Sequence, residues 1–486
     1  MSFVEKGHIL LLNEITNVIT AIVVMYIYIK EDCSDIKLSW IMVILIFPIM
    51  GLCLFIMYGS KDATKRKLAK IQKIDAELEA YMLETSLQQD NTLITQLEQT
   101  DFAVANQARY ISNYGKAPLY RNTDVVFYKD AKDGFEAQLA DLKKAKEFIF
   151  MEYHAIEDAE AFDKLKEVLA RKAAEGVEVR IFYDDVGSIG FINPEFIKEM
   201  RKQGIQCRIF NRIIPVLQIF MNNRDHRKIT VIDNKVGFTG GYNLADEYFN
   251  IVNPYGYWKD TGIRMEGDAV MNLTVAFLEL WNFIEKTDSS YDKYIKQYTY
   301  TAKETGYIQP YADNPLDDER VGENVYMNMI KNAKKYIYFM TPYLILSNEM
   351  IRELTLAAKR GVDVRIITPG IPDKKLVYRV TRSYYPVLMA HGVQIYEFTP
   401  GFCHAKQCIC DDELAVIGTI NLDYRSMYHH FENAVWMYQT KVIPEIKDDF
   451  IETFDKCNLV TDALVREQHL LTHLGNAFLR LFSTLL

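Results

Sequence analysis

The segment HRKITVID at residues 226–233 recurs 178 residues later as HAKQCICD at residues 404–411. Both copies read His-x-Lys-x4-Asp, and each is followed at the same distance by a glycine-containing turn and an asparagine. The histidine and the lysine of each copy stand at alternate positions and therefore project from the same face of a strand. The residues concerned are His226, Lys228, Asp233, Gly241 and Asn243, then His404, Lys406, Asp411, Thr419 and Asn421. Packing alone does not readily explain this duplication, so we interpret the two copies as one functional site.

The repeat extends upstream of both motifs. The paired blocks are 145–154 with 333–342, 175–183 with 360–368, and 204–210 with 392–398. Each block has the alternating, β-branched character of a strand, and helical stretches lie between the blocks. This order predicts an α/β fold with a largely buried sheet in each half. Two such halves form a pseudo-dimer, and a two-fold axis between them would bring both histidine–lysine faces into one pocket.

The N-terminus predicts a two-helix transmembrane hairpin within residues 1–60. Residues 38–58 contain no charged side chain, and about 20 apolar residues suffice to cross a bilayer. Pro48 and Gly51 are tolerated in such a helix. Residues 9–29 form a weaker candidate with polar residues in the first half, for which an interfacial or re-entrant segment is the alternative.

A basic cluster follows the second predicted span. Its members are Lys61, Lys65, Arg66, Lys67, Lys70 and Lys73. The positive-inside rule then puts everything after the hairpin in the cytoplasm and returns the N-terminus to the same side. The cluster should also attract anionic lipid, at about 1 kcal/mol per basic residue near the surface. We therefore predict a multi-pass cell-membrane protein whose catalytic part is cytoplasmic.

The predicted domain organisation has four parts. These are the hairpin at 1–60, a basic and helical connector at 61–121, a first α/β half at 122–298, and a second half at 299–486. The second half ends in an amphipathic tail from residue 466, which either packs on the core or lies in the membrane plane. The first half carries ten extra residues within 211–225. That apolar stretch is either ordinary core or a lip beside the site that meets acyl chains.

The composition excludes several classes of protein. The 486 residues are 49% hydrophobic and 25% charged, which is too apolar for a disordered chain. The net charge of −9 argues against a general nucleic-acid binder, which needs basic surface for phosphates. The seven cysteines lack zinc-site spacing, so we expect reduced thiols in a cytosolic domain and no metal site.

The duplicated motif, with Gly-Gly or Gly-Thr and then x-Asn after it, resembles the phospholipase D superfamily. Within that superfamily the chain is similar to bacterial cardiolipin synthases over essentially its whole length. The supporting stretches are NRDHRKITVIDNKVGFTGGYNLADEY at 223–248, YWKDTGIRMEG at 257–267, SYYPVLMAHGVQIYEFTPGFCHAKQ at 383–407 and GTINLDYRSMYHHFENAV at 418–435. The resemblance implies two phospholipase D-like α/β sandwich halves, a phosphohistidine intermediate, and no cofactor or metal.

The residue types fit phosphodiester chemistry. One imidazole can attack phosphorus and hold the group covalently, which divides a difficult step into two. A second, protonated imidazole can protonate the leaving alkoxide and later deprotonate the incoming hydroxyl. We favour His226 as nucleophile and His404 as acid and base, although the symmetry of the repeat leaves the reverse assignment open. The groups expected to stabilise phosphate charge are Lys228, Lys406, Asn243, Asn421 and the backbone N–H groups near Gly241 and Thr419.

Four acids accompany the two histidines. A nucleophilic histidine needs an acceptor on its second nitrogen, and the candidates are Asp260 and Glu432, with an ordinary surface acid as the alternative. Asp233 and Asp411 belong to the motif and are candidate catalytic residues. Because both end their strands, a structural role is the alternative for them.

The predicted function is cardiolipin synthesis from two phosphatidylglycerol molecules in an anionic inner leaflet, through a phosphatidyl-histidine. The predicted partners are therefore phosphatidylglycerol, cardiolipin and the lipid bilayer, without nucleic acid, and no oligomeric state is predicted. A phospholipase D-type hydrolase, or a phosphatidyltransferase with another acceptor alcohol, shares every catalytic residue and remains an alternative. A nuclease of the same superfamily and a non-catalytic scaffold are weaker alternatives.

Overall fold

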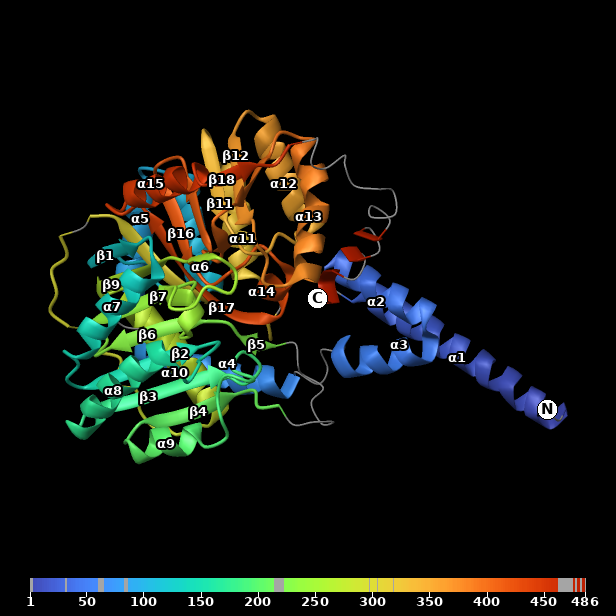
Figure 1. Ribbon diagram of the computed structural model, residues 1–486, viewed down its shortest axis with the longest axis horizontal. Helices are drawn as coiled ribbons and strands as arrows, with labels where there is room; N and C mark the ends of the chain where they lie inside the picture. The colour runs from blue at the N-terminus through green and yellow to red at the C-terminus, as the bar shows by residue number, and fades with distance from the viewer. Residues whose placement is uncertain are drawn as a thin grey trace.

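The computed structural model contains two α/β halves and a helical arm that projects from them (Figure 1). In that view the first half, in green, lies below the second half, in orange and red. The described residues are 3–30, 33–59, 65–82, 86–213, 223–296, 298–303, 305–317, 319–461, 475–476, 479–480 and 483–485.

The two halves are built on sheets with the same strand order. The first sheet runs β1 (Thr123–Tyr128), β9 (Gly262–Gly267), β7 (Val236–Gly240), β6 (Lys228–Ile232), β2 (Phe148–Tyr153), β3 (Glu178–Asp184) and β4 (Gln206–Phe210). The second runs β10 (Tyr307–Asp313), β17 (His430–Tyr438), β16 (Leu414–Gly418), β15 (Gln407–Cys410), β11 (Tyr336–Met340), β12 (Asp363–Pro369) and β13 (Gln394–Phe398), and then adds β18 (Cys457–Leu459). The matching order confirms the predicted α/β fold with two equivalent halves.

Three hydrophobic clusters join the sheets to their helices. Helices α7 (Ala131–Leu142), α8 (Glu160–Ala174) and α9 (Phe196–Lys202) share a core with the first sheet. Helices α11 (Val321–Asn332), α12 (Asn348–Lys359) and α13 (Lys375–Met389) share one with the second. The third cluster contains α10 (Val270–Ile284), α15 (Ile443–Phe454) and strands of both sheets. Strand β2 is buried along its whole length, as expected for a central strand covered on both faces.

Two short strands cross from one half to the other. Strand β5 (Arg224–Asp225) precedes the first histidine and pairs in parallel with β17 of the second half. Strand β14 (Gly401–Cys403) precedes the second histidine and pairs in parallel with β8 (Tyr257–Lys259) of the first half. The exchange is reciprocal, because the backbone immediately before each histidine pairs with a strand of the opposite half.

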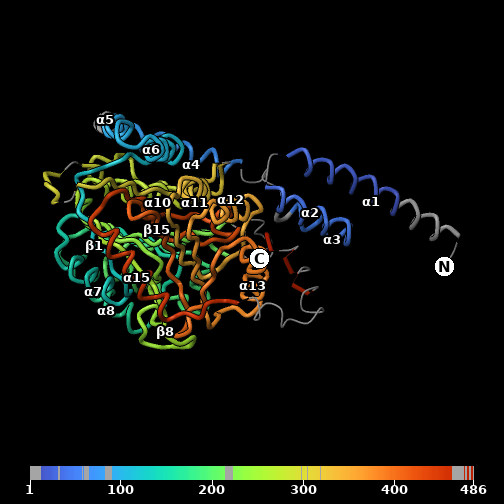
Figure 2. The backbone as a smooth tube through the Cα atoms, turned by 90° about the horizontal axis from the view of Figure 1, so that it is seen from above, coloured from blue at the N-terminus to red at the C-terminus, as the bar shows by residue number. Residues whose placement is uncertain are grey.

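The N-terminal arm consists of α1 (Phe3–Ile29), α2 (Ser34–Ile46), α3 (Pro48–Leu54) and the π-helix η1 (Phe55–Gly59). Figure 2 shows it standing away from the body, which carries α4 (Lys65–Met82), α5 (Ser86–Glu98) and α6 (Phe102–Tyr114) along one side. The arm is attached at Asp35, which accepts hydrogen bonds from Asn348 Nδ2 at 2.7 Å and from the Tyr424 hydroxyl at 2.5 Å. Close to the C-terminus, η4 (Ser483–Leu485) also meets α2, where Thr484 Oγ1 donates to Ser39 Oγ at 2.7 Å.

The predicted hairpin is not confirmed by the described residues. Throughout the described ranges, no helix is both long enough and apolar enough to cross a membrane. The predicted second span is divided at Phe47 into α2 and α3, because Pro48 has no N–H and begins a new helix. Two further predictions, the apolar lip and the C-terminal tail helix, fall mainly on residues 214–222 and 462–486, largely outside the described part.

Asp233 and Asp411 close equivalent turns at the ends of β6 and β15. The Asp233 carboxylate accepts the backbone N–H groups of Lys146, Glu147 and Phe148 at 2.7–2.8 Å. The Asp411 carboxylate accepts those of Lys334, Lys335 and Tyr336 at 2.7–2.9 Å. Both aspartates adopt positive φ, near 54° and 55°. These contacts favour the structural alternative for both aspartates, because they lie at the opposite strand ends from the histidines and hold the starts of β2 and β11. Their assignment as catalytic residues stays a prediction.

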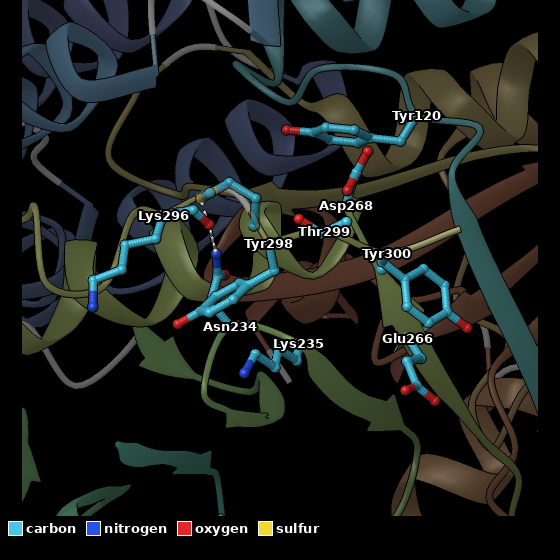
Figure 3. Close-up of a pocket in the computed structure, with 11 residues that line it drawn as sticks. Tyr120, Asn234, Lys235, Glu266, Asp268, Lys296, Tyr298, Thr299 and Tyr300 are labelled. Atoms are coloured by element: carbon cyan, nitrogen blue, oxygen red, sulfur yellow. Dashed lines mark hydrogen bonds between the residues drawn. The ribbon is translucent and has the colours of Figure 1, made fainter. Parts of the chain in front are cut away.

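A pocket lies beside the Asp233 turn (Figure 3). The chain that leaves the first half lines it with Lys296, Tyr298 and Tyr300. Asn234 Nδ2 donates to the Lys296 carbonyl oxygen at 3.0 Å, and the Lys235 ammonium lies 4.3 Å from the centre of the Tyr298 ring. These contacts hold the segment that connects the two halves against the turn that contains Asp233.

We expect Asp233→Ala to lower the stability of the protein. Loss of this carboxylate leaves three backbone N–H groups without their acceptor and should cost about 2 kcal/mol or more. The measurement is the thermal unfolding midpoint of the purified full-length protein. The matched control is Asp133→Ala, at an exposed position of α7, which should leave the midpoint unchanged. An unchanged midpoint in Asp233→Ala together with lost activity would support the catalytic assignment.

Candidate active site

Each histidine is held by a carboxylate from the opposite half. The His226 backbone N–H donates to the Phe431 carbonyl oxygen at 2.8 Å, and its Nδ1 lies 2.9 and 3.0 Å from the two carboxylate oxygens of Glu432. In the second motif, the His404 N–H donates to the Lys259 carbonyl oxygen at 2.7 Å, and Nδ1 lies 2.6 Å from Asp260 Oδ2. The short exchanged strands fix the distance from each Nδ1 atom to its carboxylate. The Nε2 atom of each ring remains available to react with a substrate.

The difference between Gly241 and Thr419 follows from the two acids beside them. The Thr419 hydroxyl donates to Glu432 Oε2 and accepts from the Asn433 N–H at 3.0 Å. At the equivalent position, a Cβ on Gly241 would stand 2.1 Å from Asp260 Oδ1. The glycine therefore makes room for one acid, whereas the threonine orients the other.

The backbone N–H groups of Gly241 and Thr419 themselves are engaged within the fold, and a phosphate contact from neighbouring N–H groups stays a prediction. The Gly241 N–H donates to the Thr261 carbonyl oxygen at 3.0 Å, and the Thr419 N–H donates to that of Asn433 at 2.9 Å. Both donors are already used within the fold, so neither is free for a phosphate oxygen.

The two lysines of the motifs lie against the histidine backbone. Lys228 Nζ donates to the His226 carbonyl oxygen at 2.6 Å. Lys406 Nζ donates to the His404 carbonyl oxygen and also lies 2.7 Å from His404 Nδ1. Both side chains are buried, and burial lowers the pKa of Lys228 to about 8 and that of Lys406 to about 7. An anionic substrate would restore the positive charge that burial disfavours.

The two acids differ in charge state. Burial alone would raise the pKa of Glu432, but the hydrogen bonds from His226 and His430 hold that pKa well below its ordinary value. Burial raises the pKa of Asp260 to about 7, against the opposing effect of Lys406. Burial also keeps the pKa of both histidines well below 6.5. Burial therefore favours the neutral form of both imidazoles. His226 lies beside the carboxylate of Glu432, and His404 lies beside Asp260, whose pKa is about 7.

The two asparagines differ in their contacts. Asn243 Oδ1 accepts from the Ala155 N–H at 3.2 Å, and its Nδ2 donates to the Tyr248 hydroxyl at 2.7 Å. The Tyr248 ring lies 5.3 Å from the His404 ring, so Asn243 belongs to the site. Asn421 Oδ1 is buried without a hydrogen-bond partner among the described residues.

Several residues of the site lack a repeat counterpart and were missed by the sequence comparison. The His154 ring packs on the edge of His226 at 5.1 Å, and its Nδ1 lies 2.7 Å from the Asp225 carbonyl oxygen. Trp258 and Phe402 pack against the His404 ring at 5.2 and 5.7 Å. His154 ends its block where the second half has a proline, and that difference was the available signal.

Arg227, between the motif histidine and lysine, points into the junction of the halves. It is fully buried and donates to the Glu432 carbonyl oxygen at 3.2 Å and to the Asp313 carbonyl oxygen at 3.1 Å. Its guanidinium also donates to Glu279 Oε2 at 2.8 Å. The second motif has Ala405 at this position, so the arginine secures the backbone of one acid only.

His226, His430 and Glu432 place ligand atoms within 4.8 Å of one another and could hold a cation. The Nδ1 atom of His226 is engaged with Glu432 within this group. The expectation of a reaction without metal stays a prediction.

Known proteins resemble both the motifs and the fold. The profile of the cardiolipin synthase, PLD-like domain matches residues 139–259 and 326–455. A cardiolipin synthase of Alkalihalophilus pseudofirmus is 32% identical over 92% of this chain and 88% of its own length. Cardiolipin synthase 2 of Bacillus anthracis is 31% identical over 95% of this chain and 88% of its own length. An uncharacterized protein of Streptococcus mutans is 43% identical over 92% of this chain and 96% of its own length.

Among solved structures, the phosphatidylserine synthase of Haemophilus influenzae shares the fold. Its TM-score is 0.57 at 12% identity, and the match covers 78% of this chain and 100% of that one. The profile spans just over half of the chain in two copies, and relatives above 30% identity cover most of its length. The chain therefore belongs to the family of cardiolipin synthases with phospholipase D-like domains.

Proposed function

We propose that this chain is a phosphatidyltransferase that makes cardiolipin and glycerol from two phosphatidylglycerol molecules. The observation that carries the proposal is the pair of histidines, each oriented by a carboxylate of the other half and accompanied by a buried lysine. This arrangement supplies a nucleophile, a proton donor and two cations for one anionic phosphodiester. Family membership supports lipid as the substrate class.

The surroundings of the two rings support His226 as the nucleophile. An ionised Glu432 accepts the proton of His226 Nδ1, which leaves a lone pair on Nε2. His404 Nδ1 lies within hydrogen-bond distance of the Lys406 ammonium, a donor. His404 Nδ1 also lies 2.6 Å from Asp260 Oδ2, and burial raises the pKa of Asp260 to about 7. A His404 ring with its proton on Nε2 can give that proton to a leaving group while Nδ1 takes the proton of Asp260, so that no imidazolate forms. The unequal neighbours of the two rings therefore support His226, and not His404, as the nucleophile.

The reaction proceeds in two displacements. His226 Nε2 attacks the phosphorus of the first phosphatidylglycerol, the phosphorus–oxygen bond to glycerol breaks, and His404 gives its Nε2 proton to the departing alkoxide. The terminal hydroxyl of a second phosphatidylglycerol then gives its proton to His404 and attacks the phosphorus of the phosphatidyl-histidine. The phosphorus–nitrogen bond breaks, and cardiolipin leaves with both histidines restored. Lys228, Lys406, Asn243 and Asn421 stabilise the charge on the non-bridging oxygens.

The burial of the site favours transfer over hydrolysis. The exposed fractions of His226 and His404 are 8% and 6%, so the intermediate forms where water is largely excluded. A phospholipase D-type hydrolase would need water at the same position. The net charge of −9 counts against the nuclease alternative.

The proposal includes attachment to the cell membrane. It keeps the two-span hairpin of residues 1–60, the connector of 61–121 and the two halves of 122–298 and 299–486. Supporting features are the exposed apolar side chains of the arm, such as Ile22, Tyr28 and Ile49, and the basic start of α4. This arrangement would hold the site at the cytoplasmic leaflet, where anionic lipid substrate is concentrated.

The first test is the product. Purified full-length protein with phosphatidylglycerol vesicles should yield cardiolipin and glycerol in equal amounts, identified by mass spectrometry. Boiled protein is the control. Phosphatidic acid as the sole lipid product would replace the synthase proposal with the hydrolase.

The second test is the covalent intermediate. Acid-free quenching during turnover should trap a phosphatidyl adduct on the peptide that contains His226, and His226→Ala should abolish it. The control is His391→Ala, a histidine that caps α13 and lies outside the site. An adduct on His404 that survives in His226→Ala would reverse the assignment.

The third test is the pH dependence. The free enzyme binds an anionic phosphodiester best when both lysines are protonated, below their pKa values of about 7 and about 8. We therefore expect kcat/KM to fall as the pH rises through 7 to 8.5, because the lysines lose their charge. A profile that stays flat to pH 9.5 would contradict this role of the lysines.

A further inference from the structure

A second pocket lies between the start of α4 and the junction of the two halves. Its apolar wall contains Phe210, Phe283 and Phe431. The ring of Phe210 lies 5.5 Å from that of Phe431 and 6.3 Å from that of Phe283, and the rings of Phe283 and Phe431 are 6.4 Å apart. Ile284 and Leu316 extend the same wall. The three rings form an apolar wall of the pocket, which a hydrocarbon chain can contact.

The same pocket also has cationic lining residues. It is lined by Arg66, Lys67 and Lys70, which α4 presents at helical spacing. The Lys70 ammonium donates to the Phe283 carbonyl oxygen at 2.5 Å and lies 5.2 Å from that ring, so it joins the cationic residues to the apolar wall. Burial and the neighbouring Arg224 guanidinium lower the pKa of Lys67. An anionic group at this position would offset the mutual repulsion of the two cations.

The pocket also borders the active site. Phe431 immediately precedes Glu432, and its carbonyl oxygen accepts the His226 N–H at 2.8 Å. The N-terminal end of α4 is turned toward the helical arm in both views of the backbone (Figures 1 and 2). The pocket is therefore lined both by the start of α4 and by Phe431, the residue whose carbonyl oxygen accepts the His226 N–H.

We propose that this pocket binds an anionic phospholipid in addition to the phosphate bound by the two motifs. Its headgroup phosphate lies at Arg66 and Lys67, and one acyl chain lies along the three phenylalanines. A free phosphate would contact the basic residues and make no contact with the phenylalanines. A zwitterionic lipid would contact the phenylalanines and bring no net charge to the basic residues. The match to both surfaces therefore selects a lipid with an acyl chain and a net negative headgroup. The proposal rests on the proposed function for the view that such lipids reach this face of the protein.

The test uses a lipid probe that needs no turnover. Full-length protein in dodecyl maltoside is mixed with phosphatidylglycerol that carries a diazirine at the end of one acyl chain, then irradiated and digested. We expect cross-links on the peptides that contain Phe210 and Phe283, in the wild type and equally in His226→Ala. Excess unlabelled phosphatidic acid should remove them, while phosphatidylcholine and inorganic phosphate should not. Because His226→Ala cannot turn over, the result is independent of the proposed reaction.

Matched variants distinguish lipid binding in the pocket from the general attraction of the basic helix α4 to anionic surfaces. Arg66→Gln with Lys67→Gln removes two charges that line the pocket, and Lys65→Gln with Lys73→Gln removes two from the same helix outside it. We expect about a tenfold loss of cross-linking in the first variant and a much smaller loss in the second. Ile284→Trp, which fills space beside the apolar wall without changing the charge, should also reduce the yield of the cross-link. Equal cross-linking in all variants, or competition by phosphatidylcholine, would overturn the proposal.

Discussion

The reciprocal pairing of β5 with β17 and of β14 with β8 is the constraint on which the active site depends. Each short strand ends one residue before a catalytic histidine and pairs beside the acid that orients it. The N–H of each histidine is fixed by the other half at 2.8 and 2.7 Å. Neither half alone contains a motif histidine together with the acid that contacts its Nδ1 atom. The duplication therefore produces one site, and the halves have diverged within it.

That divergence has a physical basis in the burial of charge. The site holds two lysines, two acids and two histidines away from water, and buried charges are costly unless they are paired. Glu432 stays ionised against His226 and receives the Thr419 hydroxyl, whereas Asp260 is accommodated because position 241 has no side chain. The two rings thus have different hydrogen-bond neighbours, as a nucleophile and a proton donor require. An incoming phosphodiester supplies the negative charge that the two lysines lack.

The sequence was sufficient for the two equivalent halves, for the motif residues and for both orienting acids, because a repeated pattern marks equivalent positions. It did not reveal which acid serves which histidine, since those partners stand 206 and 144 residues apart and meet across the pseudo-two-fold axis. Strand β5 has two residues and leaves no periodic pattern. Arg227 and His154 lack repeat counterparts, so a search for duplicated residues passed over them. The recurrence of the motif aspartates did not distinguish a catalytic from a structural role, because closing two equivalent turns also requires the same residue at both positions.

The crossed assignment of acids to histidines is tested most directly with a phosphatidyl ester of p-nitrophenol, whose leaving group needs no proton. The measurement is the rapid release of nitrophenolate in the first turnover, here called the burst, after the ester is mixed with excess enzyme. The burst should persist in His404→Ala and Asp260→Asn, and it should be lost in His226→Ala and Glu432→Gln. A burst that is retained in Glu432→Gln and lost in Asp260→Asn would contradict the crossed pairing, because it would assign each acid to the histidine of its own half.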